Sequence, residues 1–350
     1  MLERADIPLS PLTTLRLGGP AATLAEPTTV DELVSAVRDA DAAGTGVLLI
    51  GGGSNLVLAD AGWPGTAVLL RHRGVDVTVD GDRIELDVAA GEPWDALVAR
   101  TVDEGWAGWE CLSGIPGLVG ATPVQNVGAY GQEIAETISS VRVWDRTDAT
   151  IRELAPVECR FGYRDSRFKH SERYVVLSVR FSLRRQPHSA PVRYAELARR
   201  LGVDEGCPAP LASVRAAVLE LRRGKGMVLD PGDHDTWSAG SFFTNPVVTA
   251  AAADAVQAGL APGTSYPHWP GPDGTVKLSA AWLIERSGFG KGRQVGRVAV
   301  SGKHTLALTN RGGGTTAELV TLAREIRDGV RDRFGVTLRP EPRLVGVTLD

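Results

Sequence analysis

The stretch LSGIPGLVGATPVQNVGAYG, Leu112 to Gly131, constrains the fold of this chain more than any other feature. It lies in a longer interval, from Glu110 to Glu133, with no charged residue between its ends, and its glycines interrupt the periodicity of a helix or a strand. The backbone donors and acceptors of such a segment need partners. Either the segment surrounds a flat, neutral ring with polar edges, or it is an ordinary buried loop supported by Gln125 and Asn126.

A second glycine-rich segment, LLIGGGSNLVLAD, has the pattern of a strand at Val47 to Ile50, a turn at Gly51 to Asn55 and a strand at Leu56 to Ala59. Successive backbone N–H groups in such a turn can hold a phosphate. The spacing G-x-G-x-x-G is absent and no helix follows, so a nicotinamide-type fingerprint is not indicated. A tight hairpin is the alternative interpretation.

The remaining pattern predicts a mixed α and β chain. A hairpin is expected over Val75 to Val88, strands at Val141 to Trp144 and Tyr174 to Leu183, and a strand-like tail after Phe334 that adds an edge to an earlier sheet. Apolar spacing predicts the helices Val30–Ala43, Glu92–Glu104, Tyr194–Leu201, Leu211–Arg223, Pro246–Ala258, Ser279–Arg286 and Thr316–Phe334.

Charge and apolar content limit the classes of partner. The net charge of -4 over 350 residues gives no electrostatic reason to expect nucleic acid, so small ligands are favoured. No apolar run approaches the roughly 20 residues that span a membrane. The amino terminus lacks the basic and apolar stretches of a secretory signal, so we expect a cytoplasmic protein with no membrane partner.

The cysteines and the histidines do not indicate a metal site. Cys111, Cys159 and Cys207 have no paired spacing, which argues against a disulfide framework or a zinc knuckle. No H-E-x-x-H occurs, so no catalytic metal is expected. Ser241, in AGSFFTNP, stands in no G-x-S-x-G elbow, and none of the six histidines lies in a motif that marks a partner base, so a hydrolase triad is not supported.

The positive charges leave two interpretations open. Arg164, in FGYRDSRFK, could offer a forked donor to a carboxylate or form a structural ion pair with Asp165 or Glu158. The chain has only five lysines, and four of them fall between Lys225 and Lys303. That cluster either arises by chance in an arginine-rich chain or marks a site that needs compact positive charge.

Six motifs together resemble the UDP-N-acetylenolpyruvoylglucosamine reductase family. They are GGGSN, IPGLVGATPVQNVGAYG, FGYRDSRF, AGSFFTNP, DGTVKLSAAWLIE and RPEPRLVG, which occur in the family's order over nearly the whole chain. The tyrosine of PVRYAEL, Tyr194, is similar to the substrate-loop tyrosine of one subgroup of that family.

The resemblance implies an α+β fold of three domains. Two parts form an FAD-binding fold of the vanillyl-alcohol oxidase type, and an α/β domain binds the substrate. By analogy the first FAD-binding part is 1–73 with 335–350, the second is 74–208, and the substrate domain is 209–334.

The resemblance also implies the reaction. NADPH would reduce FAD, and reduced flavin N5 would pass a hydride to C3 of the enolpyruvyl ether of UDP-N-acetylglucosamine enolpyruvate, giving UDP-N-acetylmuramate for peptidoglycan synthesis. Ser241 matches the family's donor of a proton to C2, a role for which its hydroxyl needs activation by neighbours. Arg164 matches the catalytic arginine that stabilises the enolate-like charge, and Glu341 matches the catalytic carboxylate. A monomer is expected.

The implied binding residues form two sets. The residues expected to hold FAD are Gly51, Gly52, Gly53, Ser54, Asn55, Ile115, Pro116, Gly117, Gly120, Thr122, Asn126, Gly128, Ala129 and Val176. The residues expected to contact the substrate are Tyr194, Lys225, Asn245, Trp269, Lys277, Lys291 and His304.

The chain departs from the family pattern in four places. The segment between Lys225 and Ser241 is longer, Glu341 is flanked by prolines, Lys291 aligns within a residue, and His304 stands where an amide can occur. Two other functions compete with the reductase: an FAD-dependent oxidase of the same broad fold, and a non-catalytic nucleotide-sugar or flavin-binding protein. Neither gives a reason for Arg164, Ser241 and Glu341 to occur together.

Overall fold

The computed structural model describes residues 2–350, and the chain forms two compact units. Unit 1 comprises Met1–Ile7, Ala21–Gly53 and Pro64–Val228; unit 2 comprises Pro8–Pro20, Ser54–Trp63 and Leu229–Asp350. Neither unit is one continuous segment, because the chain passes between them repeatedly. None of the helices in residues 2–350 is long and apolar enough to cross a membrane.

A four-stranded sheet in unit 1 carries the turn GGGSN at the end of its edge strand β3. The sheet has the order β1-β2-β5-β3, in which β3 and β5 are parallel. Helix α1 follows β2; Thr29 caps its N-terminus by accepting from the N–H of Glu32. The strands of this sheet are β1 (Leu2–Pro8), β2 (Pro20–Glu26), β3 (Val47–Ile50) and β5 (Trp63–Leu69), and helix α1 spans Val30–Ala42.

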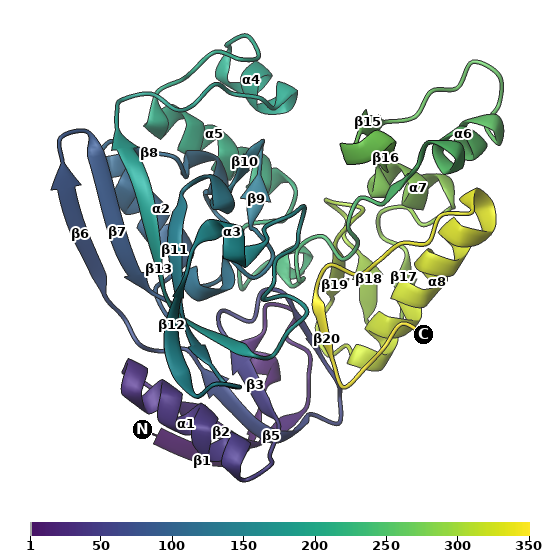
Figure 1. Ribbon diagram of the computed structural model, residues 1–350. Helices are drawn as coiled ribbons and strands as arrows, with labels where there is room; N and C mark the ends of the chain where they lie inside the picture. The colour runs from purple at the N-terminus through teal and green to yellow at the C-terminus, as the bar shows by residue number, and fades with distance from the viewer. Residues whose placement is uncertain (1) are drawn as a thin grey trace. The chain divides into compact units, whose positions relative to one another are not determined.

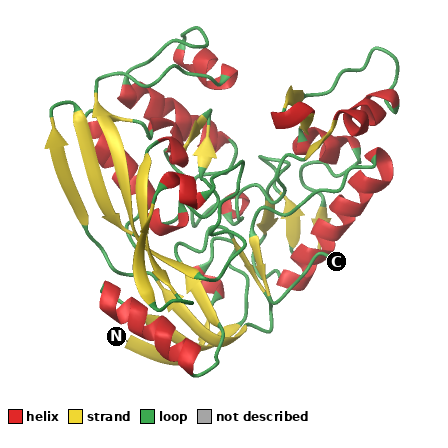
Figure 2. Ribbon diagram, in the orientation of Figure 1, coloured by secondary structure: helices red, strands yellow, loops and turns green. Residues whose placement is uncertain are grey.

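A larger antiparallel sheet forms the main core of unit 1. Its order is β12-β11-β13-β7-β6, with β8 also paired to β13, and its long strands are drawn in yellow in Figure 2. Trp94, Trp109 and Phe181 pack together as one buried aromatic group. The strands are β6 (Val75–Asp80), β7 (Arg83–Ala89), β8 (Trp106–Ala107), β11 (Ile138–Asp145), β12 (Thr150–Leu154) and β13 (Tyr174–Arg185).

Helices and short elements complete unit 1. Figure 1 shows α4 beside α5, and Leu197, Ala198, Val214 and Val218 are buried between them. The elements are α2 (Trp94–Asp103), η2 (Glu110–Leu112), η3 (Val119–Ala121), β9 (Gly128–Ala129), β10 (Gln132–Glu133), η4 (Ile134–Glu136), α3 (Pro156–Cys159), α4 (Ala195–Leu201) and α5 (Leu211–Gly224).

Unit 2 packs three small sheets with three helices around Phe242, Phe243, Leu283 and Ile326. The sheets are β14-β16-β15, β17-β18-β19 and the parallel pair β20-β4. The elements are η1 (Ser10–Leu12), β4 (Leu56–Leu58), η5 (His234–Thr236), β14 (Val247–Thr249), α6 (Ala250–Ala258), β15 (His268–Pro270), η6 (Pro272–Gly274), β16 (Thr275–Leu278), α7 (Ala280–Arg286), β17 (Gln294–Val295), β18 (Val298–Val300), β19 (Leu308–Asn310), α8 (Thr316–Phe334) and β20 (Arg343–Val345).

Most of the predicted elements are confirmed, and two interpretations are wrong. The helix predicted from Pro246 begins at Ala250, because Val247–Thr249 pairs with β16 as a strand and Thr249 caps the helix. The turn GGGSN is no hairpin, because β3 pairs with β5 whereas β4 pairs with β20. The carboxyl tail does form a strand that pairs with an earlier segment, but β20 and β4 make a sheet of their own and do not extend an earlier one.

Candidate active site

The two glycine-rich segments meet at their backbones in unit 1. A Cβ atom on Gly52 would lie 2.6 Å from the Cα of Gly117, so no other residue fits at position 52 without displacing the segment Leu112 to Gly131. Gly53 and Gly117 have φ values of +62° and +128°, which favour glycine. The turn after β3 therefore forms one cradle with the segment Leu112 to Gly131.

Backbone hydrogen bonds fix the uncharged segment against residues 90–94. Val119 donates to the carbonyl of Glu92, Gly120 to that of Ala90, and the carbonyl of Gly117 accepts from Trp94. A Cβ on Gly120 would lie 2.4 Å from the Cβ of Ala90, so glycine is required for this close approach.

Asn126 supports this segment with its side chain. The Nδ2 of Asn126 donates to Glu133 at 2.7 Å and to the carbonyl of Gly162 at 3.0 Å, and its Oδ1 accepts from the N–H of Ala135. Thr122 similarly donates its hydroxyl hydrogen to the carbonyl of Val119. The loop-supporting interpretation of Asn126 is thus correct for its side chain, and a cofactor contact at this position would use the backbone.

Arg164 lies against the same uncharged segment. It adopts a left-handed conformation with φ +53°, and its guanidinium donates to the carbonyls of Gly128 and Asn126. Asp165, one of the two carboxylates considered as its partner, lies 2.9 Å from His170. The other, Glu158, accepts from the backbone N–H of Ala155. The structure therefore places the Arg164 guanidinium beside the segment expected to line the cofactor.

Arg222 is a functional candidate that the sequence interpretation missed. Within residues 2–350 its buried Nε has no hydrogen-bond partner, and its Nη2 donates to the carbonyl of Met227. Burial lowers the pKa of Arg222. A Cβ on Gly114 would lie 3.4 Å from this Nε, so the unsatisfied donor lies beside the uncharged segment. A signal existed in the sequence: Arg222 is four and eight residues after Val218 and Val214, on the buried face of α5.

Tyr194 and Lys225, both expected to contact the substrate, lie in one group in unit 1. The ring of Tyr130 lies edge to face with that of Tyr194, with centroids 5.3 Å apart. The Nζ of Lys225 lies 5.9 Å from the centroid of the Tyr130 ring. Burial raises the pKa of Tyr130 to about 12, so this phenol stays neutral. The structure therefore brings these two candidates together around Tyr130.

In unit 2 the backbone brings AGSFFTNP and Glu341 together. Phe242 donates to the carbonyl of Leu306 at 2.7 Å, and the N–H of Glu341 donates to the carbonyl of Phe242 at 2.8 Å. Phe242 and Phe243 are buried with ring centroids 5.0 Å apart, so they anchor the segment while Ser241 stays half-buried. Ser241 and Glu341 thus lie on adjacent backbone segments.

The asparagines of two motifs make defined contacts in unit 2. The Oδ1 of Asn245 accepts from the N–H of Ala280 at 3.0 Å, at the start of α7. The backbone of Asn55 accepts from the N–H of Arg343 at 2.9 Å, and its Nδ2 lies 3.5 Å from the carbonyl of Glu341.

Of the remaining substrate candidates, two lie together. Trp269 and Lys277 are partners in the register of β15 and β16, and the Lys277 Nζ lies 5.7 Å from the Trp269 ring centroid. Lys291 is exposed on the turn before β17. Val176 and Ile115, expected at the cofactor, lie in and against the core of unit 1.

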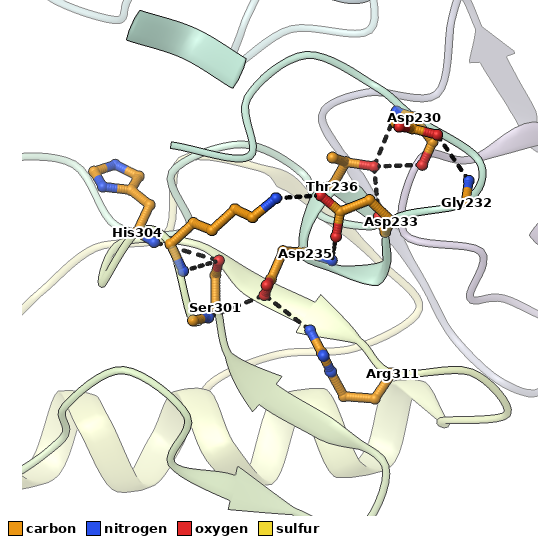
Figure 3. Close-up of polar contacts among 10 residues, drawn as sticks. Asp230, Gly232, Asp233, Asp235, Thr236, Ser301, His304 and Arg311 are labelled. Carbon is orange, nitrogen blue, oxygen red and sulfur yellow. Dashed lines mark hydrogen bonds and ion pairs between the residues drawn. The ribbon is translucent and has the colours of Figure 1, made fainter. Parts of the chain in front are cut away.

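The longer segment before Ser241 is fastened by ion pairs to the loop that carries His304. The Nζ of Lys303 donates to Asp233 at 2.5 Å, and the N–H of Gly302 donates to Asp235 at 2.9 Å. Figure 3 shows Asp235 in contact with Arg311 as well. The imidazole of His304 points away from this group (Figure 3). Lys303 therefore has a structural partner in Asp233. The other three lysines of its cluster, by contrast, are expected to contact the substrate.

Fold and site together define a class of protein. The glycine cradle and the buried, unsatisfied Nε of Arg222 fit a large planar cofactor with polar edges and a diphosphate. No group of three or more His, Cys, Asp or Glu within residues 2–350 could hold a metal ion. Residues 21–155 match the family model described as an FAD binding domain, so the chain is a flavoprotein of the vanillyl-alcohol oxidase type with an added α/β unit.

The family follows from closer comparisons. Residues 230–345 match the model of the UDP-N-acetylenolpyruvoylglucosamine reductase C-terminal domain. A UDP-N-acetylenolpyruvoylglucosamine reductase of Salinispora arenicola is 58% identical over 349 residues, which cover 99% of this chain and 96% of the relative. The solved enzyme of that name from Thermus caldophilus is 26% identical, with a TM-score of 0.66 over 98% of this chain and 100% of that one. This chain belongs to the UDP-N-acetylenolpyruvoylglucosamine reductase family.

A more distant neighbour agrees in fold alone. A solvent-stable cholesterol oxidase is 12% identical, with a TM-score of 0.51 over 94% of this chain and 85% of that one. The resemblance and the fold class predicted from the motifs are therefore confirmed. The subgroup marked by Tyr194, the three-domain division and the role of each site residue stay predictions.

Proposed function

We propose that this chain reduces UDP-N-acetylglucosamine enolpyruvate to UDP-N-acetylmuramate, with FAD as bound cofactor and NADPH as reductant, in the synthesis of peptidoglycan precursors. Two features found together in a member of this family support the proposal. Gly52 and Gly117 form a glycine cradle, and the segment that contains Ser241 is joined to Glu341 by a backbone hydrogen bond. The cradle suits FAD, and the second feature suits delivery of a proton.

The reaction adds a hydride to C3 and a proton to C2 of a vinyl ether. Bound FAD supplies the hydride after it has been reduced. Negative charge develops at C2 and in the neighbouring carboxylate, so fixed donors there lower the barrier. Arg164 provides such a donor, Ser241 gives its proton to C2, and Glu341 orients the reacting groups.

The nucleotide and the diphosphate of the substrate are bound by polar and charged side chains of both units in this proposal. Lys225 and Tyr194 in unit 1, and Asn245 and the Trp269–Lys277 pair in unit 2, bind the nucleotide and its diphosphate, together with Lys291 and His304. Lysine side chains at these positions can form charge-assisted hydrogen bonds with the oxygens of the diphosphate. The residues that would hold the FAD diphosphate are Gly51, Gly52, Gly53, Ser54 and Asn55. Those that would contact its ring are Ile115, Pro116, Gly117, Gly120, Thr122, Asn126, Gly128, Ala129 and Val176.

The proposal also includes the oligomeric state, the cellular compartment and the domain division of the enzyme. The enzyme works as a monomer in the cytoplasm, where its nucleotide-sugar substrate and NADPH are available. Three domains, 1–73 with 335–350, 74–208 and 209–334, divide the work between cofactor and substrate.

Steady-state assay of the purified, FAD-loaded protein tests this function. Consumption of NADPH without oxygen should depend on the enolpyruvyl substrate, and mass spectrometry should find a product heavier by one hydride and one proton. An oxidase would consume NADPH only with oxygen, and a non-catalytic binding protein would not consume it at all.

A further inference from the structure

Lys225, which the proposed function assigns to the charged part of the substrate, is already in contact with a carboxylate. Its Nζ lies 2.5 Å from the Oε2 of Glu196. Lys225 is the C-cap residue that follows α5, and Glu196 lies in the first turn of α4. The two side chains are 32% and 38% exposed, so a ligand from solvent can reach the pair.

The surroundings hold this pair in a defined place. The buried residues between α4 and α5, which include Leu197 and Val214, fix the helix that carries Glu196. The Lys225 ammonium also faces the ring of Tyr130, whose centroid is 5.9 Å away. Together the aromatic ring and the carboxylate compensate the ammonium in the unliganded enzyme.

An anion that binds Lys225 must compete with Glu196. A carboxylate and a phosphate oxygen accept from the same N–H groups, and after displacement the charge of Glu196 still repels the arriving anion. A diphosphate brings two negative charges and can replace the carboxylate, whereas a singly charged anion gains little by the exchange. The pair therefore discriminates by charge.

We propose that Glu196 is a built-in counter-ion of the substrate site: it neutralises Lys225 in the unliganded enzyme and is displaced by the substrate diphosphate. Glu196 thereby weakens anion binding and reserves the site for ligands with two adjacent negative charges. This inference rests on the proposed role of Lys225.

Calorimetry with the oxidised, FAD-loaded enzyme tests the inference, because without NADPH the substrate binds and does not turn over. Glu196→Gln should lower the Kd of UDP-N-acetylglucosamine enolpyruvate about three- to fivefold at low ionic strength. It should also make Kd rise more steeply with salt. Glu196→Asp should restore values near wild type, and Glu196→Gln in a Lys225→Met background should lower Kd by less than it does in the wild type.

Glu220→Gln is the matched control. Glu220 forms an ion pair with Arg200 that also joins α5 to α4, and its side chain is exposed. Loss of the Glu220 charge should leave the Kd unchanged. This result would show that breaking an ion pair between α4 and α5 does not by itself change substrate binding.

The outcomes separate two kinds of failure. If Lys225→Met weakens binding but Glu196→Gln leaves Kd unchanged or raises it, Glu196 is no competing counter-ion and the inference is wrong. If Lys225→Met itself leaves Kd unchanged, the assignment of Lys225 to the substrate is wrong and the inference fails with it.

Discussion

At the scale of single residues, Ser241 has the most demanding task, because a hydroxyl is a poor acid near neutral pH unless its neighbours lower its pKa. We expect Ser241→Ala to slow reoxidation of the reduced flavin by the substrate about 10²- to 10⁴-fold. Reduction by NADPH should remain close to the wild-type rate, because no proton from Ser241 is needed in that half-reaction. Stopped-flow absorbance measures the two steps separately.

Ser287→Ala provides the control for this variant. Within residues 2–350 the buried hydroxyl of Ser287 has no hydrogen-bond partner, so its loss should change neither half-reaction. Equal slowing of both half-reactions in Ser241→Ala would contradict the assigned role.

Gly52 gives a second test at the residue scale. Gly52→Ala would place a Cβ 2.6 Å from the Cα of Gly117, which must separate the two halves of the cradle. We expect the purified variant to lose most of its bound FAD, as measured by flavin absorbance, with an unchanged far-ultraviolet spectrum. Gly224→Ala, where a Cβ meets nothing within 4 Å, should retain it.

Asp145 predicts a pH dependence of stability. It is fully buried and accepts two hydrogen bonds from Arg173, each 2.7 Å, which hold the pKa of its carboxyl well below the usual range. The contribution of Asp145 to the free energy of unfolding is complete when the pH is above the pKa of this carboxyl in the unfolded chain, roughly 4. This contribution is lost as the pH falls toward the pKa of the carboxyl in the folded protein.

Asp145→Asn should therefore lower the free energy of unfolding by about 1–2 kcal/mol at neutral pH. The variant should lose less further stability than the wild type below about pH 4. Urea unfolding at several pH values measures both effects, and parallel curves for the two proteins would show that this carboxylate does not cause the acid sensitivity.

At the scale of secondary-structure elements, α8 depends on a residue distant in sequence. Both carboxylate oxygens of Asp60 accept from the first N–H groups of the helix, those of Thr316 and Ala317, at 2.8 and 2.9 Å. Asp60→Ala should destabilise unit 2 by about 1–2 kcal/mol through these lost caps. Denaturant unfolding should show no such loss for Asp254→Asn, an exposed position on α6.

Local signals explain which elements were predictable. The helix over Thr316–Phe334 has a capping box at Thr315 and Glu318 and a regular apolar face, and its predicted bounds are correct. The local pattern predicts a helix over Val247–Thr249, because the strand with which these residues pair, β16, lies far along the chain. Pairing over such separations leaves no local pattern.

The candidate site shows the same limit. Motifs predicted Ser241 and Glu341, and the structure places their backbones side by side. Arg222 and Glu196 were missed because each looks like an ordinary helix residue until its neighbours are known. The close approach of Gly52 to Gly117 was likewise invisible, since nothing local links the two motifs.

At the scale of the whole molecule, the units divide the proposed chemistry. Unit 1 contains Gly51 to Gly53, the uncharged segment, Arg164 and the Lys225 group, whereas unit 2 contains Ser241, Glu341 and the Trp269–Lys277 pair. In the proposed reaction Ser241 and Glu341 of unit 2 act only in substrate reduction, so the account predicts that this step can be lost while flavin reduction is kept.

Anaerobic stopped-flow absorbance of the flavin tests the central claim most directly. The enzyme is reduced with NADPH and then mixed with UDP-N-acetylglucosamine enolpyruvate. The account predicts rapid reoxidation of the flavin with formation of the lactyl ether of UDP-N-acetylmuramate. A reduced flavin that only oxygen reoxidises would contradict it.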